Sequence, residues 1–250
     1  MKAKAAVFMG ANVPFEVREF EITDTPAGYG RSELIASGIC GTDVHFHNGK
    51  LSVAAPTIIG HEFVGRLVDL NGEEGKRYGL KKGDRVIADI AVPCGECLLC
   101  KSGDDANCVR MRVTNGGSIE TPPYLFGGYT RVNYTPLSNL IRIPEQLDAE
   151  MVCIFACPGP TAMHAFALAG RAGVDLADIR TAVVQGLGPV GTYAVMYLKA
   201  MGVKQVFAIT AGTNARREEL AKSLGASEVF NLSRTGAAQI NESLSLIHIS

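Results

Sequence analysis

The sequence predicts a two-domain protein, α+β to α/β in class, with a β-rich domain over residues 1–150 and a partial α/β domain over residues 151–243. Residues 1–150 are rich in Gly, Pro and β-branched residues and show few helix-period patterns, which is typical of short strands joined by loops. After residue 150, strand-like apolar runs alternate with helix-like runs, which indicates βαβ units and a parallel sheet. A chain of 250 residues has room for both domains.

The first domain contains several short runs with strand character. β-branched residues and apolar alternation favour strands over helices in these runs. The predicted strands are Lys4–Phe8, Glu33–Ser37, Phe63–Leu70, Arg85–Ala88 and Thr130–Asn133.

The second domain is predicted from an alternation that starts with an apolar, helix-compatible segment. The predicted elements are helix Met151–Ala169, strand Ala182–Gln185, helix Val190–Met201, strand Gln205–Thr210, helix Arg216–Leu224 and a strand beginning at Glu228–Asn231. A doubly wound dinucleotide-binding domain has about six strands, so this unit is expected to be incomplete. The alternation then stops, with no third helix expected. The tail at residues 244–250, LSLIHIS, resembles a translated sequencing adaptor and is expected to be non-native.

Composition excludes several classes of function. The formal net charge is −1, from 24 basic and 25 acidic side chains, which provides no basic field for nucleic acid. We expect no apolar run to approach the roughly 20 residues that span a bilayer. The N-terminal MKAKAAVFMGANVPFEVREF has too short an apolar stretch for a signal peptide. We therefore expect a cytoplasmic protein with no nucleic-acid or membrane partner.

Four of the seven cysteines lie within residues 94–108, in a C-x2-C-x2-C-x7-C array. Clustered thiols in a reducing compartment favour a metal over disulfides. Four thiolates close the tetrahedral shell of a zinc ion, so this zinc would be structural. Free cysteines, a redox CxxC pair and an iron–sulfur cluster are the alternatives. The predicted ligands are Cys94, Cys97, Cys100 and Cys108.

A second metal site is predicted from three separate segments, GICGTDVH, GHE and CIFACPGPT. Cys40, His61 and Cys157 would supply two thiolates and one imidazole, which leaves an open fourth position on a catalytic zinc. Each residue alone is weak evidence, because a single cysteine or histidine is usually an ordinary buried side chain. In this order and these contexts the three together indicate a Lewis-acid centre.

These motifs resemble the zinc-containing medium-chain alcohol dehydrogenases over roughly residues 1–240. The resemblance is carried by GICGTDVH, GHEFVG, the four-cysteine array and a later GxGxxG. It implies a GroES-like catalytic domain followed by a Rossmann domain, and an assembly of two or four identical subunits at full length. It also implies that Cys40, His61 and Cys157 hold a catalytic zinc. Glu62 would be a neighbour that approaches the metal, and Asp43 would orient His61.

Thr42 and His45 are the predicted proton path. Hydride leaves an alkoxide more readily than an alcohol, so a hydroxyl proton must first be passed on, and histidine titrates near neutral pH. The alternative for Thr42 is a hydroxyl bonded to backbone at a strand end. His47 competes with His45, because both would lie on one side of an extended segment.

The dinucleotide site is predicted at a strand, glycine turn and helix start, TAVVQGLGPVG. The glycines would provide the tight turn, the close approach of backbone to a pyrophosphate, and the packing of helix on strand. The helix N-terminus would face the phosphates. Thr161 is a further expected cofactor contact. The predicted turn residues are Gly186, Leu187, Gly188, Pro189, Val190 and Gly191.

The cofactor is predicted to be NADP rather than NAD. An NAD enzyme would place an acid about 20 residues after the turn, but the sequence from Ile179 to Arg217 has none. Arginines and the absence of a carboxylate favour a 2′-phosphate. The alternative is that the arginines simply begin a helix on its solvent face. The predicted contacts are Gly212, Thr213, Asn214, Arg216 and Arg217.

Together these features predict a zinc-dependent oxidoreductase that moves hydride between a small primary or secondary alcohol or polyol and NAD(P)+. The substrate partner would be a small alcohol or carbonyl compound. A truncated, non-catalytic zinc-binding fragment of such an enzyme is the alternative for these 250 residues. A zinc-free reductase of the same superfamily would lack the cysteine array and the paired ligands.

Overall fold

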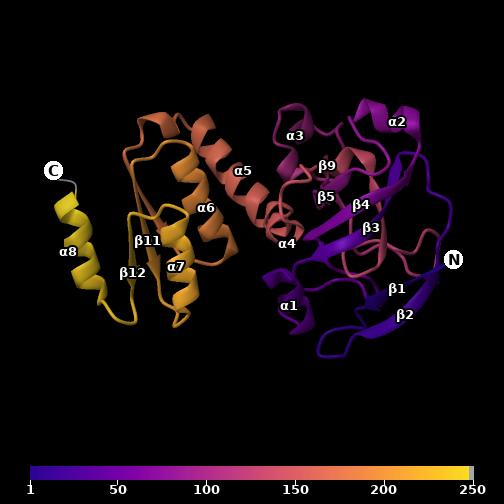
Figure 1. Ribbon diagram of the computed structural model, residues 1–250, viewed down its shortest axis with the longest axis horizontal. Coiled ribbons are helices and arrows are strands. Elements are labelled where there is room, and N and C mark those ends of the chain that lie inside the picture. Colours follow the sequence, from indigo (N-terminus) through magenta and orange to yellow (C-terminus); the bar gives the residue numbers. More distant parts are fainter. Residues whose placement is uncertain (248–250) are drawn as a thin grey trace. The chain divides into compact units, whose positions relative to one another are not determined.

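The computed structural model describes residues 1–247 and divides into two compact units, residues 1–157 and 158–250 (Figure 1). The first unit is an antiparallel β structure, and the second is a short parallel sheet with helices. Both predicted classes are confirmed. Residues 248–250, part of the tail expected to be non-native, lie outside the described residues.

The main sheet of the first unit has five antiparallel strands in the order β8-β3-β4-β5-β9. The strand predictions over 63–70 and 85–88 are confirmed to the residue. A separate pair joins β1 (Lys2–Val7) to β2 (Glu16–Glu21). The sheet strands are β3 (Tyr29–Ser37), β4 (Phe63–Leu70), β5 (Arg85–Ala88), β8 (Val132–Pro136) and β9 (Leu140–Arg142).

Strand β4 lies in the core and is buried on both faces. Phe63 and Leu67 pack into one apolar cluster, with Leu137 from the 3-10 turn Leu137–Asn139. Val64, on the opposite face, packs with Ile87 of β5. This follows from the two-residue period of a strand, which sends successive side chains to opposite faces.

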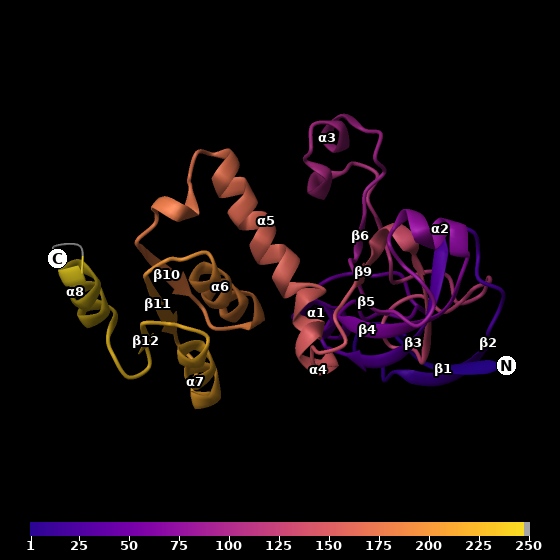
Figure 2. The same cartoon turned by 45° about the horizontal axis from the view of Figure 1, so that its top comes forward.

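Short helices and a projecting lobe complete the first unit. Helix α2 (Gly72–Arg77) is capped by Asn71. The lobe is based on the paired strands β6 (Ala91–Val92) and β7 (Arg112–Val113). Figure 2 shows it standing away from the sheet, with α3 (Leu98–Lys101) at its end. A 3-10 turn at Asp105–Asn107 follows α3.

The expectation of an extended segment around His45 was wrong. Residues Gly41–His47 form helix α1. Cys40 is extended, with φ −75° and ψ 153°, and its backbone N–H donates to the Asp43 carboxylate at 3.0 Å. A short acceptor at the third helical position starts a helix in this way, and a helix of 7 residues is too short to show a clear helical period.

The second unit is a three-stranded parallel sheet in the order β10-β11-β12. This is the order in which a doubly wound sheet begins. Helix α6 (Pro189–Ala200) follows β10 (Thr181–Gln185), and α7 (Ala215–Ser223) follows β11 (Gln205–Thr210). The predicted alternation is confirmed. The remaining elements are β12 (Glu228–Asn231), α5 (Pro158–Arg171) and a 3-10 turn at Leu176–Asp178.

The expectation of no third helix was wrong, because α8 (Ala237–Ile247) follows β12. Ile240 is buried and packs against Phe207 and Phe230 from two strands of the sheet. That packing, rather than helix-favouring residues, explains the helix.

The length of one apolar stretch was underestimated from the sequence. By length and composition alone, Ala149–Arg171 is long and apolar enough to cross a membrane. In the structure it consists of α4 (Ala149–Val152), a 3-10 turn (Cys153–Phe155) and α5. Val152 and Cys153, near its start, are buried with Val64 of β4 in one apolar cluster.

Candidate functional site

Two segments of the predicted metal site are brought together by the pairing of β3 with β4. Ser37, at the end of β3, pairs with Phe63, at the start of β4. Just beyond this pair, the Gly38 N–H donates to the Glu62 carbonyl at 2.6 Å. Cys40 and His61 therefore lie next to each other just beyond the same end of the sheet.

The third segment reaches this end of the sheet through α4 and the turn after it. Val152, Cys153 and Ala156 pack on Val64 of the sheet, which carries Cys157 to the same place. The Cys40 and Cys157 sulfur atoms lie 4.0 Å apart. Potential ligand atoms of four residues all lie within 4.8 Å of one another: Cys40, His61, Glu62 and Cys157.

The chemistry of this cluster fits a zinc ion. Two sulfurs of one tetrahedral zinc, each about 2.3 Å from the metal, would be ~3.8 Å apart. Burial, and next the charge of Cys40, raise the pKa of Cys157 to about 12. Two thiolates beside a buried carboxylate repel one another, and a divalent cation removes that repulsion. The cluster therefore has the donor set and the electrostatic demand of a metal site.

His61 lies beside Asp43, the residue that the resemblance implies would orient it. Both side chains are 3% exposed, and the Nδ1 atom of His61 lies 3.7 Å from the Oδ1 atom of Asp43. The separation is within ion-pair range but longer than a hydrogen bond. Both atoms are buried without a hydrogen-bond partner in the described part of the chain. This arrangement leaves Nε2 of His61 as the atom for a metal.

Glu62 lies at the cluster because glycine makes room for its side chain. A Cβ atom on Gly38 would come within 2.7 Å of the Glu62 carboxylate. Glu62 itself is 9% exposed. A carboxylate this close to two sulfurs and an imidazole can serve as a further ligand.

The four cysteines of the lobe also come together. The Cys97 and Cys100 sulfurs are 3.4 Å apart, and the Cys94 and Cys100 sulfurs are 3.9 Å apart. The Cys108 sulfur accepts the backbone N–H of Cys94 at 3.2 Å. All four ligand atoms lie within 4.8 Å of one another, as one tetrahedral ion requires.

Backbone donors around the lobe favour thiolates. The N–H of Glu96, and next that of Cys97, lower the pKa of Cys94 to about 6. The N–H of Cys100 lowers the pKa of Cys97. Burial raises the pKa of Cys100 to about 12, so the four sulfurs do not all ionise readily without a cation. The lobe thus provides a closed set of four sulfur donors.

The predicted proton path lies on α1. Thr42 is half-buried and His45 is exposed. Three positions apart on a helix, they are neighbours on its surface. His47 is two positions from His45 and so points to a different side. Its ring stacks on Phe15 at 6.0 Å and its Nδ1 is buried without a partner among the described residues, so the exposed His45 suits proton exchange better.

The predicted glycine turn lies between β10 and the start of α6. Gly186 has φ +98°, and its N–H donates to Ile209 of β11 at 2.8 Å. A Cβ on Gly191 would lie 1.8 Å from the Gly186 carbonyl oxygen, so only glycine fits there. A Cβ on Gly188 would meet nothing within 4 Å, so the space in front of α6 is open. Leu187 is buried, and Pro189 opens the helix.

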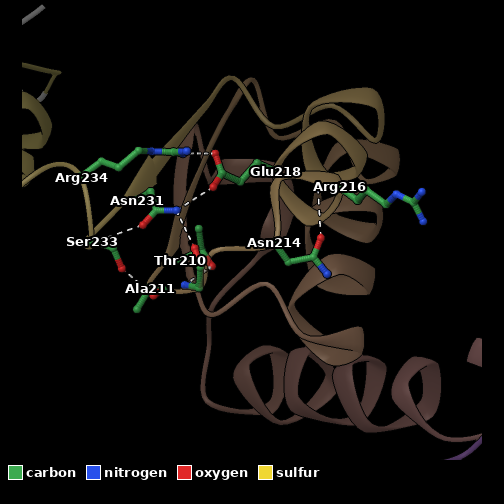
Figure 3. A network of polar contacts seen from close by, with 9 residues as sticks. Thr210, Ala211, Asn214, Arg216, Glu218, Asn231, Ser233 and Arg234 are labelled. Atoms are coloured by element: carbon green, nitrogen blue, oxygen red, sulfur yellow. Dashed lines mark hydrogen bonds and ion pairs between the residues drawn. The ribbon is translucent and has the colours of Figure 1, made fainter.

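The loop after β11 carries the predicted adenosine contacts. Gly212, Thr213, Arg216 and Arg217 are exposed, and neither arginine forms an ion pair with a described residue. Asn214 accepts the Arg216 N–H at 3.1 Å and so caps α7. Both arginines thus do lie in the first turn of a helix, as the alternative held. Figure 3 shows the Arg216 side chain extending into the open.

A polar network from β12 and the residues after it holds this loop (Figure 3). Asn231, at the end of β12, donates to the Gly212 carbonyl at 2.8 Å and to the Glu218 carboxylate at 2.6 Å. Arg234 also pairs with Glu218. The bond from Asn231, and next the bond from Arg234, lower the pKa of Glu218. The first acid after β11 is therefore already engaged within the protein.

Every ligand of the two clusters was predicted from the sequence. The residues that hold polar groups of the site in place were not. Tyr129, which donates to Asp43 at 2.9 Å, and Asn231 were both missed. Neither lies in a recognisable motif, and each acts across a long sequence separation. Thr161, predicted near the cofactor, is exposed on α5.

The chain is similar to known dehydrogenases in sequence and in structure. The family model of the alcohol dehydrogenase GroES-like domain matches residues 33–145. L-idonate 5-dehydrogenase (NAD(P)(+)) of Escherichia coli (strain K12) is 30% identical over 203 residues, 80% of this chain and 55% of the relative. S-(hydroxymethyl)glutathione dehydrogenase of Photobacterium damsela subsp. piscicida is 30% identical over 246 residues, 92% of this chain and 64% of the relative.

A crystal structure of an alcohol dehydrogenase from Thermotoga maritima is similar with a TM-score of 0.87 and 30% identity. The similarity covers 99% of this chain and 68% of that one. The chain spans 54% to 64% of the length of these and similar curated relatives.

Proposed function

Because this chain belongs to the zinc-containing medium-chain alcohol dehydrogenase family, we propose that the full-length protein moves hydride between a small alcohol and NAD(P)+. The substrate would be a primary or secondary alcohol, or a polyol. The observation that carries the proposal is the convergence of Cys40, His61, Glu62 and Cys157. The relatives' names cover a sugar acid, an amino acid and a glutathione adduct, so the alcohol itself stays open.

The residues that would hold the catalytic zinc are Cys40, His61 and Cys157. When bound there, zinc supplies Lewis acidity, which makes a substrate hydroxyl easier to deprotonate and a carbonyl easier to reduce. Two thiolates balance the ion's charge. Asp43 holds His61 in one orientation, and Glu62 offers a further oxygen donor beside them. The lobe cysteines would hold a second, structural zinc.

Thr42 and His45 would carry the substrate's proton away. Thr42 is half-buried next to Asp43, and its hydroxyl can both accept and donate a proton. His45 lies one turn further along α1 and is exposed, so it can exchange a proton with water near neutral pH. The placement of one partly buried and one exposed group on neighbouring positions supports an outward path.

We propose NADP over NAD as the cofactor. The exposed arginines Arg216 and Arg217 offer charge to a 2′-phosphate. Glu218 does not offset this, because Asn231 and Arg234 already engage its carboxylate. The turn Gly186–Gly191 would hold the pyrophosphate, and Thr161 would add a contact. The protein would act in the cytoplasm as a homodimer or homotetramer.

For these 250 residues alone, a non-catalytic zinc-binding fragment is the second candidate. The observation that favours it is the coverage of 54% to 64% of the curated relatives' length. Strand β10 also lies at an edge of its sheet, so one side of its backbone has no strand partner among the described residues. We expect this chain to bind zinc and to turn over little alcohol.

The test is a measurement of metal content followed by an alcohol panel on the full-length protein, with NAD+ and NADP+ in parallel. The proposal predicts about two zinc ions per chain and reduction of a dinucleotide by at least one alcohol. If the folded protein contained no zinc and still catalysed reduction of a substrate, it would be a zinc-free reductase instead.

A further inference from the structure

Asp43 has two carboxylate oxygens with different neighbours. The Oδ1 atom lies 3.7 Å from Nδ1 of His61. The Oδ2 atom accepts two hydrogen bonds, from the Cys40 backbone N–H at 3.0 Å and from the Tyr129 hydroxyl at 2.9 Å. Two donors on one oxygen fix the rotation of the carboxylate, so Oδ1 is held toward the histidine.

Tyr129 is itself firmly placed. Its backbone N–H donates to Ile59 at 3.2 Å, and its carbonyl accepts from Ala6 at 2.8 Å. Its ring lies on Gly60, where a Cβ atom would come within 2.7 Å of a ring carbon. The edge of the ring also packs against Phe15, with centroids 6.3 Å apart. Because Gly60 precedes His61 in the chain, the ring contacts the segment that carries the ligand, while the hydroxyl bonds to Asp43 beside it.

We propose that Tyr129 is a positioning residue for the His61 ligand, acting through the Asp43 carboxylate. This inference rests on the proposed function, because it assumes that His61 holds a metal. The torsion of an aspartate carboxylate about its last bond is soft, so loss of the hydroxyl leaves Asp43 with one bond on Oδ2 and a wider range of orientations. His61 then meets the metal from less constrained angles, and the metal is held less tightly.

The conservative change Tyr129→Phe removes only the hydroxyl and keeps the ring on Gly60. A matched control is Tyr134→Phe. Tyr134 is also a tyrosine of the first unit, fully buried, and its hydroxyl donates to the Thr23 carbonyl at 2.7 Å. Both variants lose one hydrogen bond of a tyrosine, but Tyr134 has no bond to Asp43. A purely structural role for Tyr129 would make the two variants behave alike.

The experiment is zinc release from the 250-residue chain to a chelator, followed at equilibrium and in time. Two sites contribute to the zinc release. Cys40→Ser, which removes a ligand, identifies the part of the release that comes from the site of Cys40, His61 and Cys157. Thermal unfolding confirms that each variant is folded. We expect Tyr129→Phe to lower the zinc affinity of this site about tenfold, at the lower end of the ~10–100-fold seen when a partner of a metal ligand is removed. We expect Tyr134→Phe to leave the zinc affinity unchanged.

Combining Tyr129→Phe with Asp43→Asn provides an independent check. If the hydroxyl acts through the carboxylate, Tyr129→Phe has little further effect once Asp43 is altered. Equal zinc retention by Tyr129→Phe and the parent chain, or an equal loss in both tyrosine variants, would overturn the inference while leaving the proposed function intact. If Cys40→Ser removed no zinc component, the proposed function would fail, and the inference with it.

Discussion

The sulfur atoms of Cys40 and Cys157 lie 4.0 Å apart, although 117 positions separate them in the sequence. Neither residue is placed by its own neighbours. Cys40 follows the end of β3, and Cys157 is delivered by the packing of α4 on the same sheet. The sheet therefore provides the rigid frame on which a two-sulfur ligand set is assembled.

We predict that Cys40→Ser removes one zinc ion from the full-length protein. A serine oxygen is a poor zinc ligand, so turnover should fall by more than the ~100-fold upper range for outer-shell changes. Metal analysis and steady-state kinetics measure both effects. Cys153→Ser is the control, because Cys153 is buried nearby, yet its sulfur donates to the Ala149 carbonyl and lies outside the cluster. Unchanged turnover in Cys40→Ser would rule out the zinc assignment.

Two glycine substitutions should separate structure from cofactor binding. Gly191→Ala places a Cβ 1.8 Å from the Gly186 carbonyl, so we expect a destabilisation of about 1–3 kcal/mol or more. Gly188→Ala meets no atom within 4 Å, so its cost in stability should be about 1 kcal/mol or less. It should nevertheless weaken dinucleotide binding at least about tenfold, because backbone must approach the pyrophosphate there.

Thermal unfolding and cofactor titration of the full-length variants test this pair. Gly170→Ala is the control, because Gly170 lies on α5 with open space around it. Normal cofactor affinity in Gly188→Ala would show that the phosphates do not lie against this turn.

Arg216 and Arg217 should determine the preference for NADP. Replacing both with alanine removes charge-assisted hydrogen bonds worth about 1.5–3 kcal/mol, so NADP+ should bind roughly 10–100-fold more weakly. NAD+ binding should change little, because NAD+ lacks the 2′-phosphate. Arg180→Ala, an exposed arginine outside this loop, should affect neither. An equal loss for the two cofactors would contradict the assignment.

The Glu218 network should make the second unit less stable in acid. The hydrogen bond from Asn231 lowers the pKa of Glu218 below its ordinary value of about 4.3. A carboxylate with a lowered pKa in the folded state contributes stability above the pKa of the unfolded chain and loses it as the pH falls through the folded value. Glu218→Gln should therefore be less stable than the parent at pH 7, with the difference shrinking in acid.

Denaturant unfolding of the two proteins at neutral and acidic pH measures this difference. Glu219→Gln is the matched control at an exposed neighbouring position. If the difference in the free energy of unfolding between the parent and Glu218→Gln stayed constant with pH, ionisation of Glu218 would not contribute to stability.

The strands and the ligands could be predicted from the sequence because each has a local pattern. The strand over 63–70 is rich in apolar residues, and the four lobe cysteines lie close together. Cys40, His61 and Cys157 needed the resemblance as well, since no local rule joins a cysteine to another 117 positions away.

The elements and contacts that were missed depend on packing. Helix α1 is a single short helix whose start is set by the Asp43 carboxylate, and α8 is held by Ile240 against two strands. Tyr129 reaches Asp43 across 86 positions, and a tyrosine after two glycines gives no sign of that bond. Local propensity does not contain such tertiary contacts.

The central claim is that Cys40, His61 and Cys157 bind one zinc ion, and the position of zinc in crystals of the full-length protein tests it most directly. Anomalous scattering at the zinc absorption edge locates the metal independently of any assumed ligand. The account predicts a peak about 2.3 Å from both sulfurs and about 2.0–2.1 Å from a nitrogen of His61, with a second peak in the lobe. Zinc in the lobe alone, with these three side chains holding no metal, would contradict it.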